Sequence, residues 1–255
     1  MAESLRTVEA FGASRAAFPT LHVPESALPE PGRPPKGGEV ALWWLDTDRE
    51  IVGGHPVAAE GTPLSPEERE RSARLRRPGD RHRYRAAHIG LRLVLGGYTG
   101  LAPEALGLVR EDCPCCGAPH GRPALAGGGP HFSLSHSDGL ALIAVSGVKV
   151  GADVEGVPRP AITDELLPSL HPREQSALRA LPDAARPEAL ARVWTRKEAY
   201  LKATGVGLAY GVADPYVGVS ETAAELADFA VHDVPTPLPS YAAAIALATA
   251  SPLLP

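Results

Sequence analysis

The stretch from Val193 to Leu208 (VWTRKEAYLKATGVGL) constrains this chain more than any other part of its sequence. At 3.6 residues per turn, apolar side chains of this stretch and of the turn before it form one stripe, which predicts a buried helix. The stripe comprises Leu190, Val193, Trp194 and Leu201. Glu198 and Lys202 are four residues apart, so they emerge side by side on one edge of that helix. A solvated ion pair is the simplest interpretation, but lysine is scarce in this chain. Among 25 lysines and arginines only four are lysine, and Lys197 and Lys202 are two of them. A compact ammonium kept at this place indicates a chemical role.

Composition bounds the class of protein. The 255 residues are 44% hydrophobic and 22% charged, which is typical of a globular protein with one large domain or two small ones. No apolar run is long enough to span a membrane, and the N-terminus lacks the pattern of a signal peptide, so we expect a cytoplasmic protein with no membrane association. The net charge of -5 argues against bulk nucleic-acid binding.

A basic region nevertheless lies in the first half. Between Ser65 and Arg92 there are nine arginines against four acidic residues, namely Glu67, Glu68, Glu70 and Asp80. Ser65 is a predicted N-cap, with Pro66 at the first helical position and Glu68 completing a capping box. Pro78-Gly79 should break this helix before a second one from about Asp80 to Tyr98. Guanidinium groups bind phosphate bidentately, so the region suits a multiply phosphorylated anion, although most of the nine should be surface charges.

Strand patterns occur on both sides of residue 150. The predicted strands cover residues 39–46, 131–137, 140–145, 148–154 and 241–247, with hairpin turns at Asp138-Gly139 and Ser146-Gly147. A helical region is expected over 163–179. We therefore predict an α+β fold of two similar halves, 39–150 and 151–250, each with helices packed on a small antiparallel sheet. Residues 1–38, rich in Pro, Ala and Gly, are expected to form a loosely ordered arm.

Three carboxylates could form a metal site. Asp153 and Glu155 are two apart on a predicted strand, so they project from one face, and Glu198 would add a third carboxylate. An all-oxygen set suits a hard cation such as Mg2+. The alternative is that Asp153 and Glu155 merely end a strand in solvent, because acidic pairs are common on surfaces.

Ser135 and His136 end another predicted strand. Adjacent strand residues point to opposite faces, so they are poorly placed as a nucleophile and its base. They could instead contact phosphate oxygens, with the imidazole held protonated by the anion. A structural histidine is the alternative.

The cysteines are confined to one loop. Cys113, Cys115 and Cys116 cannot form a disulfide framework, which agrees with a reducing compartment. Cys113, Cys116 and His120 have the spacing of a metal knuckle. A closed zinc site needs four ligands and the sequence contains no second Cys pair, so the spacing alone does not predict one.

The combined motifs resemble the Sfp-type 4'-phosphopantetheinyl transferase family. The chain matches that family's two-part signature at Val150, Gly151 and Asp153, and some forty residues later at Trp194, Thr195, Lys197, Glu198, Ala199 and Lys202. Ala152 departs from the usual Val or Ile. Gly121-Arg122-Pro123 and FSLSHS (residues 132–137) resemble two further family motifs, and the resemblance spans about residues 64–247.

The resemblance implies a fold, a reaction and site roles. The family fold is an α+β pseudo-dimer with its site between the halves. Its members transfer the phosphopantetheine arm of coenzyme A to a serine of an acyl or peptidyl carrier protein, as in polyketide, nonribosomal peptide or fatty acid synthases, and release adenosine 3',5'-bisphosphate. By this resemblance Asp153, Glu155 and Glu198 would hold Mg2+ (or Mn2+), and Glu198, Lys202 and Asp153 would be catalytic. The coenzyme A contacts would be Arg71, Arg83, Arg122, Ser135, His136, Lys197 and Lys202.

The resemblance also sets expectations for partners. The carrier protein should dock on a basic or apolar patch near the cleft. We expect a monomer, because the pseudo-dimer already supplies both walls of the site. Two alternatives stay open: a different Mg2+-dependent phosphoanhydride hydrolase, and a non-catalytic binding module on the same fold.

Overall fold

The computed structural model describes residues 20–26, 28, 32–207 and 211–249, and its fold is of the α+β class, as predicted. A four-stranded sheet has the order β1 (Thr20–His22), β2 (Val40–Asp46), β8 (Leu140–Ser146) and β7 (His131–Ser137). A three-stranded sheet has the order β10 (Phe229–Asp233), β11 (Tyr241–Ala248) and β9 (Val150–Gly156). Each sheet is therefore built from one side of residue 150.

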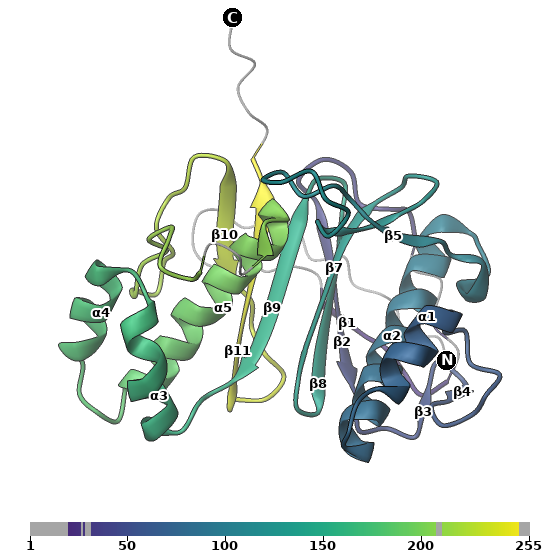
Figure 1. The fold of residues 1–255 in the computed structure, drawn as a ribbon, viewed down its shortest axis with the longest axis horizontal. Coiled ribbons are helices and arrows are strands. Elements are labelled where there is room, and N and C mark those ends of the chain that lie inside the picture. The colour runs from purple at the N-terminus through teal and green to yellow at the C-terminus, as the bar shows by residue number, and fades with distance from the viewer. Residues whose placement is uncertain (1–19, 27, 29–31, 208–210, 250–255) are drawn as a thin grey trace, which may run out of the picture.

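The two sheets and two long helices lie in layers (Figure 1). Helix α2 (Pro78–Thr99) covers the outer face of the four-stranded sheet, and α5 (Arg186–Thr204) covers that of the three-stranded sheet. The inner faces of the sheets share a core of Val, Leu, Ile and Ala side chains from β2, β8, β9 and β11. Burial of these three apolar interfaces supplies the main driving force for the fold.

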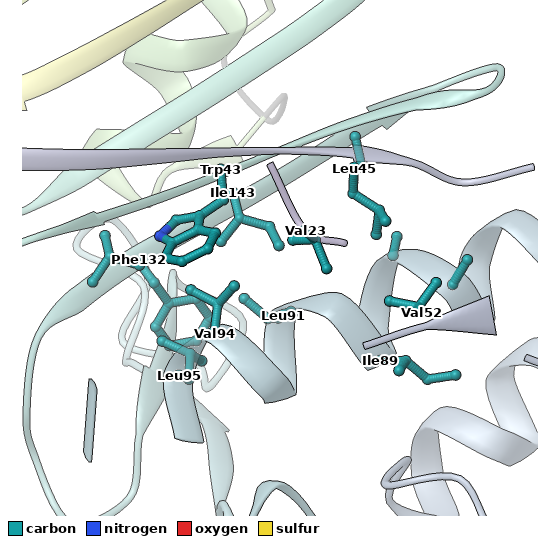
Figure 2. Packing of buried hydrophobic residues seen from close by; sticks show 14 of the residues in the cluster. Val23, Trp43, Leu45, Val52, Ile89, Leu91, Val94, Leu95, Phe132 and Ile143 are labelled. Carbon is teal, nitrogen blue, oxygen red and sulfur yellow. The ribbon is translucent and has the colours of Figure 1, made fainter. Parts of the chain in front are cut away.

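The adjacent tryptophans of β2 illustrate how one strand serves two cores. Trp43 and Leu45 face α2, where they pack with Ile89, Val94 and Ile143 (Figure 2). Trp44 points the other way, into the core between the sheets. The unbroken apolar run from Val40 to Leu45 is thus explained by burial on both faces of the strand.

The helix boundaries follow local chemistry. In α1 (Pro66–Ala73) the Ser65 side chain accepts from Glu68 N, and the predicted capping box is confirmed. Helix α2 begins two residues earlier than predicted, because Pro78 occupies a first-turn position where its missing N–H costs nothing. The region predicted as one helix over 163–179 is divided by prolines into α3 (Pro160–Leu166), the 3-10 helix η2 (Leu167–Ser169) and α4 (Pro172–Arg179).

Two other predictions are corrected. The turn at Ser146-Gly147 does not form a hairpin, because β9 leaves the first sheet and pairs with β11 of the second. Within the expected N-terminal arm, residues 20–22 form β1 and pair in parallel with β2, while residues 1–19, 27 and 29–31 lie outside the described part. Short elements complete the first half: β3 (Ile51–Val52), β4 (His55–Pro56), η1 (Pro103–Ala105), β5 (Leu108–Arg110) and β6 (Pro123–Leu125).

In the part of the chain that the structure describes, none of the helices combines the length and the apolar character that crossing a bilayer requires.

Gly151 sets the distance between β9 and α5. A Cβ atom at this position would overlap the backbone at Ala199 O and Ala203 N, so the helix lies directly on the strand. The glycine of the GADVE motif is therefore needed for close packing of backbone on backbone.

We expect Gly151→Ala to lower the free energy of unfolding by about 1–3 kcal/mol or more, because helix backbone must move to admit the methyl group. Gly61→Ala is a matched control, since a Cβ there would have no atom within 4 Å. Urea titrations of both variants measure the difference. Equal stability of the two would contradict the proposed close contact.

Candidate active site

A cavity of about 1020 Å³ opens where the two halves meet. Its walls come from α1, α2, β5, the loop between β5 and β6, β7, β9 and α5. Among the residues that the sequence analysis assigned to catalysis, metal binding or coenzyme A binding, nine line it: Arg71, Arg83, Arg122, Ser135, His136, Asp153, Glu155, Glu198 and Lys202. Segments separated by more than a hundred residues therefore contribute to one polar cavity.

The floor of the cavity is a seam between β7 and β9, which are edge strands of different sheets. From Ser133 onward every second residue of β7 is a serine, and these hydroxyls take the place of a backbone ladder. Ser133 Oγ accepts from Ala152 N at 2.9 Å, Ser135 Oγ donates to Asp153 Oδ1 at 2.7 Å, and Ser137 Oγ donates to Glu155 Oε2 at 2.7 Å. Period-two alternation places the three serines on one side of the strand.

Asp153 is the most buried acid of the cavity, with 2% of its surface exposed. Its Oδ1 atom accepts from Lys202 Nζ at 2.6 Å and from Ser135 Oγ. Its Oδ2 atom is buried and has no hydrogen-bond partner among the described residues. Burial raises the pKa of the carboxyl, and the positive charge of Lys202 opposes that shift. A buried carboxylate oxygen without a partner is costly, so it is an open position for a cation.

Glu155 and Glu198 add two more carboxylates to the same cavity. Burial, followed by the charge of Asp153, raises the pKa of Glu155 to about 7. Burial and Asp153 also raise the pKa of Glu198. When all three acids are ionised, their combined negative charge exceeds the single positive charge of Lys202.

These carboxylates fit a hard divalent cation in donor type and in charge. All their donors are oxygen, one of them has no partner, and a cation between them would relieve their mutual repulsion. However, the carboxylate oxygens of these three residues do not all lie within 4.8 Å of one another. Among the described residues, a group of three metal-ligating side chains that meets this distance occurs at Cys113, Cys116 and His120.

Basic side chains also line the wall of the cavity. Arg83 Nε donates to Asp48 Oδ1 at 2.7 Å, and Arg122 is held by Glu111 Oε2 at 2.5 Å. Arg71 is exposed and has no carboxylate within 4.0 Å among the described residues, so it has no competitor for an anion. Of the nine arginines between Ser65 and Arg92, Arg71 and Arg83 line the cavity, while Arg92 is buried in an ion pair with Glu68 at 2.6 Å.

His136 also lines this wall. Burial lowers the pKa of its imidazole, and the charges of Lys202 and Arg83 lower it further. Both effects favour the uncharged imidazole. That a bound anion would stabilise the protonated ring stays a prediction.

Sequence patterns missed three contributors to the cavity. Tyr84 and His88 stack with their ring centroids 3.9 Å apart, and burial lowers the pKa of His88 to about 4. Arg110 donates to Gly121 O at 3.0 Å. Tyr84 and His88 are four residues apart, so their contact on one face of the helix could have been predicted from the sequence. No sequence pattern predicted the position of Arg110.

Lys197 is the prediction that the structure overturns. Its side chain lies outside the cavity and is fully enclosed, with Nζ 2.8 Å from Glu174 Oε2 and 2.6 Å from Pro215 O. The assignment of Lys197 to coenzyme A binding is therefore wrong. On a helix, Lys197 and Lys202 are five residues apart and point to different sides, so only Lys202 reaches the cavity.

The sequence is similar to those of several known proteins. Residues 149–245 match the model of the 4'-phosphopantetheinyl transferase superfamily. The chain is 40% identical over 174 residues to the 4'-phosphopantetheinyl transferase HetI of Nostoc sp., covering 67% of this chain and 70% of HetI. It is 28% identical over 145 residues to a 4'-phosphopantetheinyl transferase of Bacillus subtilis, covering 57% of this chain and 62% of that protein.

A third relative comes from another organism. The L-aminoadipate-semialdehyde dehydrogenase-phosphopantetheinyl transferase of Eremothecium gossypii is 41% identical over 122 residues, covering 44% of this chain and 41% of that protein.

We expect Lys197→Met to destabilise the chain by about 3–5 kcal/mol, because it leaves Glu174 buried without its cation. Lys149→Met, at an exposed lysine, should change stability by less than about 0.5 kcal/mol. Thermal unfolding compares the two variants, and adding Glu174→Gln to Lys197→Met should restore part of the loss. A Lys197→Met protein that unfolds like the parent would reinstate a role for this lysine in ligand binding.

Proposed function

The chain belongs to the 4'-phosphopantetheinyl transferase superfamily and is a phosphopantetheinyl transferase, and from this premise we propose its substrates and the roles of its residues. The donor is coenzyme A and the acceptor is a serine hydroxyl of an apo acyl or peptidyl carrier protein. The serine oxygen forms a bond to the phosphorus that carries the pantetheine arm. The anhydride bond to the nucleotide phosphate breaks, and adenosine 3',5'-bisphosphate leaves.

The observation that carries this proposal is the polarity of the cavity. Asp153, Glu155 and Glu198 form its acidic floor, and Arg71, Arg83 and Arg122 line the same cavity. A substrate with a pyrophosphate and a separate phosphate needs both features: a divalent cation for the pyrophosphate and guanidinium groups for the outlying phosphate. Such a division matches coenzyme A.

Mg2+ is the cation that we assign to Asp153, Glu155 and Glu198, with Mn2+ as a possible substitute. When bound, it would neutralise charge that develops on the pyrophosphate oxygens. Its charge would also lower the raised pKa values of Glu155 and Glu198.

Glu198 is our candidate for the base that accepts the serine proton. Its carboxylate lines the cavity together with Lys202 and Asp153, so a serine hydroxyl bound there would have one of its oxygens as a proton acceptor. Asp153 fixes Lys202 by the 2.6 Å ion pair, and Lys202 would hold a pyrophosphate oxygen beside it. Ser135 Oγ lies 2.9 Å from Lys202 Nζ and would orient that ammonium.

His136 and the three arginines would bind the phosphates. Arg83 and Arg122 are already oriented by Asp48 and Glu111, which reduces the entropy lost when the anion binds. His136 faces the same cavity and would gain a proton on binding the anion.

The carrier protein and the setting are also proposals. The arginine-rich α1 and α2 beside the opening suit an acidic partner, and synthases of polyketides, nonribosomal peptides or fatty acids supply such carriers. We place the enzyme in the cytoplasm as a monomer, because its three cysteines are free thiols and both walls of the cavity come from one chain.

The two alternatives from the sequence receive less support. Hydrolysis of a phosphoanhydride would use the same cation and arginines, but the named relatives are transferases. A non-catalytic module would be expected to lack one of the three carboxylates, and all three line the cavity.

Transfer is tested by the intact mass of a purified apo carrier protein after incubation with the enzyme, coenzyme A and Mg2+. We expect the carrier to gain one phosphopantetheine, and this gain to be lost with chelator. Glu198→Gln and Asp153→Asn should each reduce turnover by at least about 100-fold, because both remove charge from the reacting centre. Glu225→Gln, at an exposed acid, is the matched control and should retain turnover. Release of adenosine 3',5'-bisphosphate without any carrier would support a hydrolase instead.

The pH dependence of stability tests the acidic floor. A carboxyl whose pKa is higher in the folded than in the unfolded state binds protons more tightly when folded, so ionisation destabilises the fold. The protonated Glu155 therefore contributes stability that is fully present below pH 4.5. That contribution is lost as the pH rises through the folded-state pKa of about 7. We expect the Tm of the metal-free protein to fall over this window, less steeply in Glu155→Gln than in the parent.

Mg2+ should raise the Tm most at the upper end of the same window, where the carboxylates are ionised. Thermal unfolding with Mg2+ or with chelator across the window measures both effects. Identical pH slopes for Glu155→Gln, Glu225→Gln and the parent would contradict the buried, cation-free environment inferred for Glu155.

A further inference from the structure

The loop between β5 and β6 gathers three metal-binding side chains that the proposed reaction does not use. The ligand atoms of Cys113, Cys116 and His120 all lie within 4.8 Å of one another. Cys116 Sγ is 3.0 Å from His120 Nε2. Within the described part of the chain, these three residues form the one group of this kind.

The backbone of the loop folds these residues together. Cys113 N donates to Ala118 O at 2.8 Å and Gly117 N donates to Cys113 O at 2.9 Å. Gly117 has a φ of 72°, a left-handed conformation that closes the turn and favours glycine. This turn brings the sulfur atoms of Cys113 and Cys116 close together.

The three side chains of the cluster differ in their exposure to solvent. The Cys113 side chain is buried, whereas Cys116 and His120 are exposed. A cation held by all three would therefore have one side toward solvent.

We propose that Cys113, Cys116 and His120 bind one Zn2+ ion, whose fourth ligand is a water molecule. Two thiolates and an imidazole are a soft donor set that prefers zinc, in contrast to the oxygen donors of the acidic floor. Ligands at about 2.0–2.3 Å from a tetrahedral zinc ion lie roughly 3.5 Å apart. The observed cluster is close enough to reach that geometry by small side-chain movements.

The site bears on the cavity through the residues that follow it. His120, Gly121 and Arg122 all line the cavity. Gly121 N donates to Glu111 O at 2.8 Å, and a Cβ on Gly121 would come within 2.6 Å of that oxygen. Zinc at the tip of the loop would thus restrict the segment that presents Arg122 to the anion, which makes the three ligands positioning residues.

The test uses the full chain, purified with reductant and without chelator, then loaded with Zn2+ or with Co2+ as a spectroscopic substitute. We expect one equivalent of bound Zn2+ and, with Co2+, a thiolate-to-cobalt charge-transfer band. Cys116→Ser and His120→Gln should each weaken metal affinity by at least about 10-fold, as measured by competition with a chromophoric chelator. The matched control, Cys115→Ser, alters an exposed neighbour outside the cluster and should keep the parent's affinity.

Two further measurements separate this site from the acidic one. Asp153→Asn should leave the charge-transfer band unchanged, because carboxylates do not produce it. Removing zinc should raise the Kd for adenosine 3',5'-bisphosphate in the parent but not in Arg122→Gln. Because the metal spectra require no carrier protein, they are readable whether or not transfer occurs.

Several results would overturn the proposal. One is a Co2+ complex without the charge-transfer band. Another is a band lost in Cys115→Ser as completely as in Cys116→Ser. A third is a reduced, folded chain that binds no Zn2+ equivalent. Recovery of Cys113 and Cys116 as a disulfide from reductant-containing buffer would also exclude it.

Discussion

The seam between β7 and β9 is the constraint on which the rest of the structure depends. Two sheets meet there through edge strands, and an unpaired edge would leave backbone groups without partners. Serine hydroxyls at alternate positions of β7 occupy that edge, and two of them donate to Asp153 and Glu155. The hydrogen bonds that join the halves at this seam therefore also orient two carboxylates of the acidic floor, so folding and the geometry of the cavity are linked at this place.

Helix α5 extends that constraint to the other layer. Its backbone rests on Gly151, which fixes how deep Glu198 and Lys202 stand above β9. On its far side two fully enclosed cations, Arg196 and Lys197, bind carboxylates and carbonyls of the chain from 174 to 233. Removing one partner of such a pair leaves an uncompensated buried charge. The free-energy cost of that charge is larger than the net stabilisation that the intact pair provides. One face of the helix thus anchors it, and another lines the cavity.

The cavity concentrates charge at a cost to the folded state. Asp153, Glu155 and Glu198 are crowded and largely withdrawn from water, and burial raises the pKa of each. A divalent cation would remove that cost, and so would protonation. Stability, cation binding and catalysis should therefore be linked through these same three carboxyl groups. Zinc bound at the cysteine loop, as we propose, would act separately on Arg122.

Local patterns in the sequence predicted the parts that depend on near neighbours. The capping box at Ser65, the strand carrying Trp43 and Trp44, and the Glu198–Lys202 edge all follow from spacing, because periodicity and capping act over a few residues. The α+β class followed from the same patterns and from the family resemblance. Long-range geometry decided the rest. It placed β9 in the second sheet, buried Lys197 against Glu174, and brought Arg110 beside Gly121. Burial and partner choice depend on residues distant in the chain, so only the tertiary structure could assign one lysine of the motif to the core and the other to the cavity.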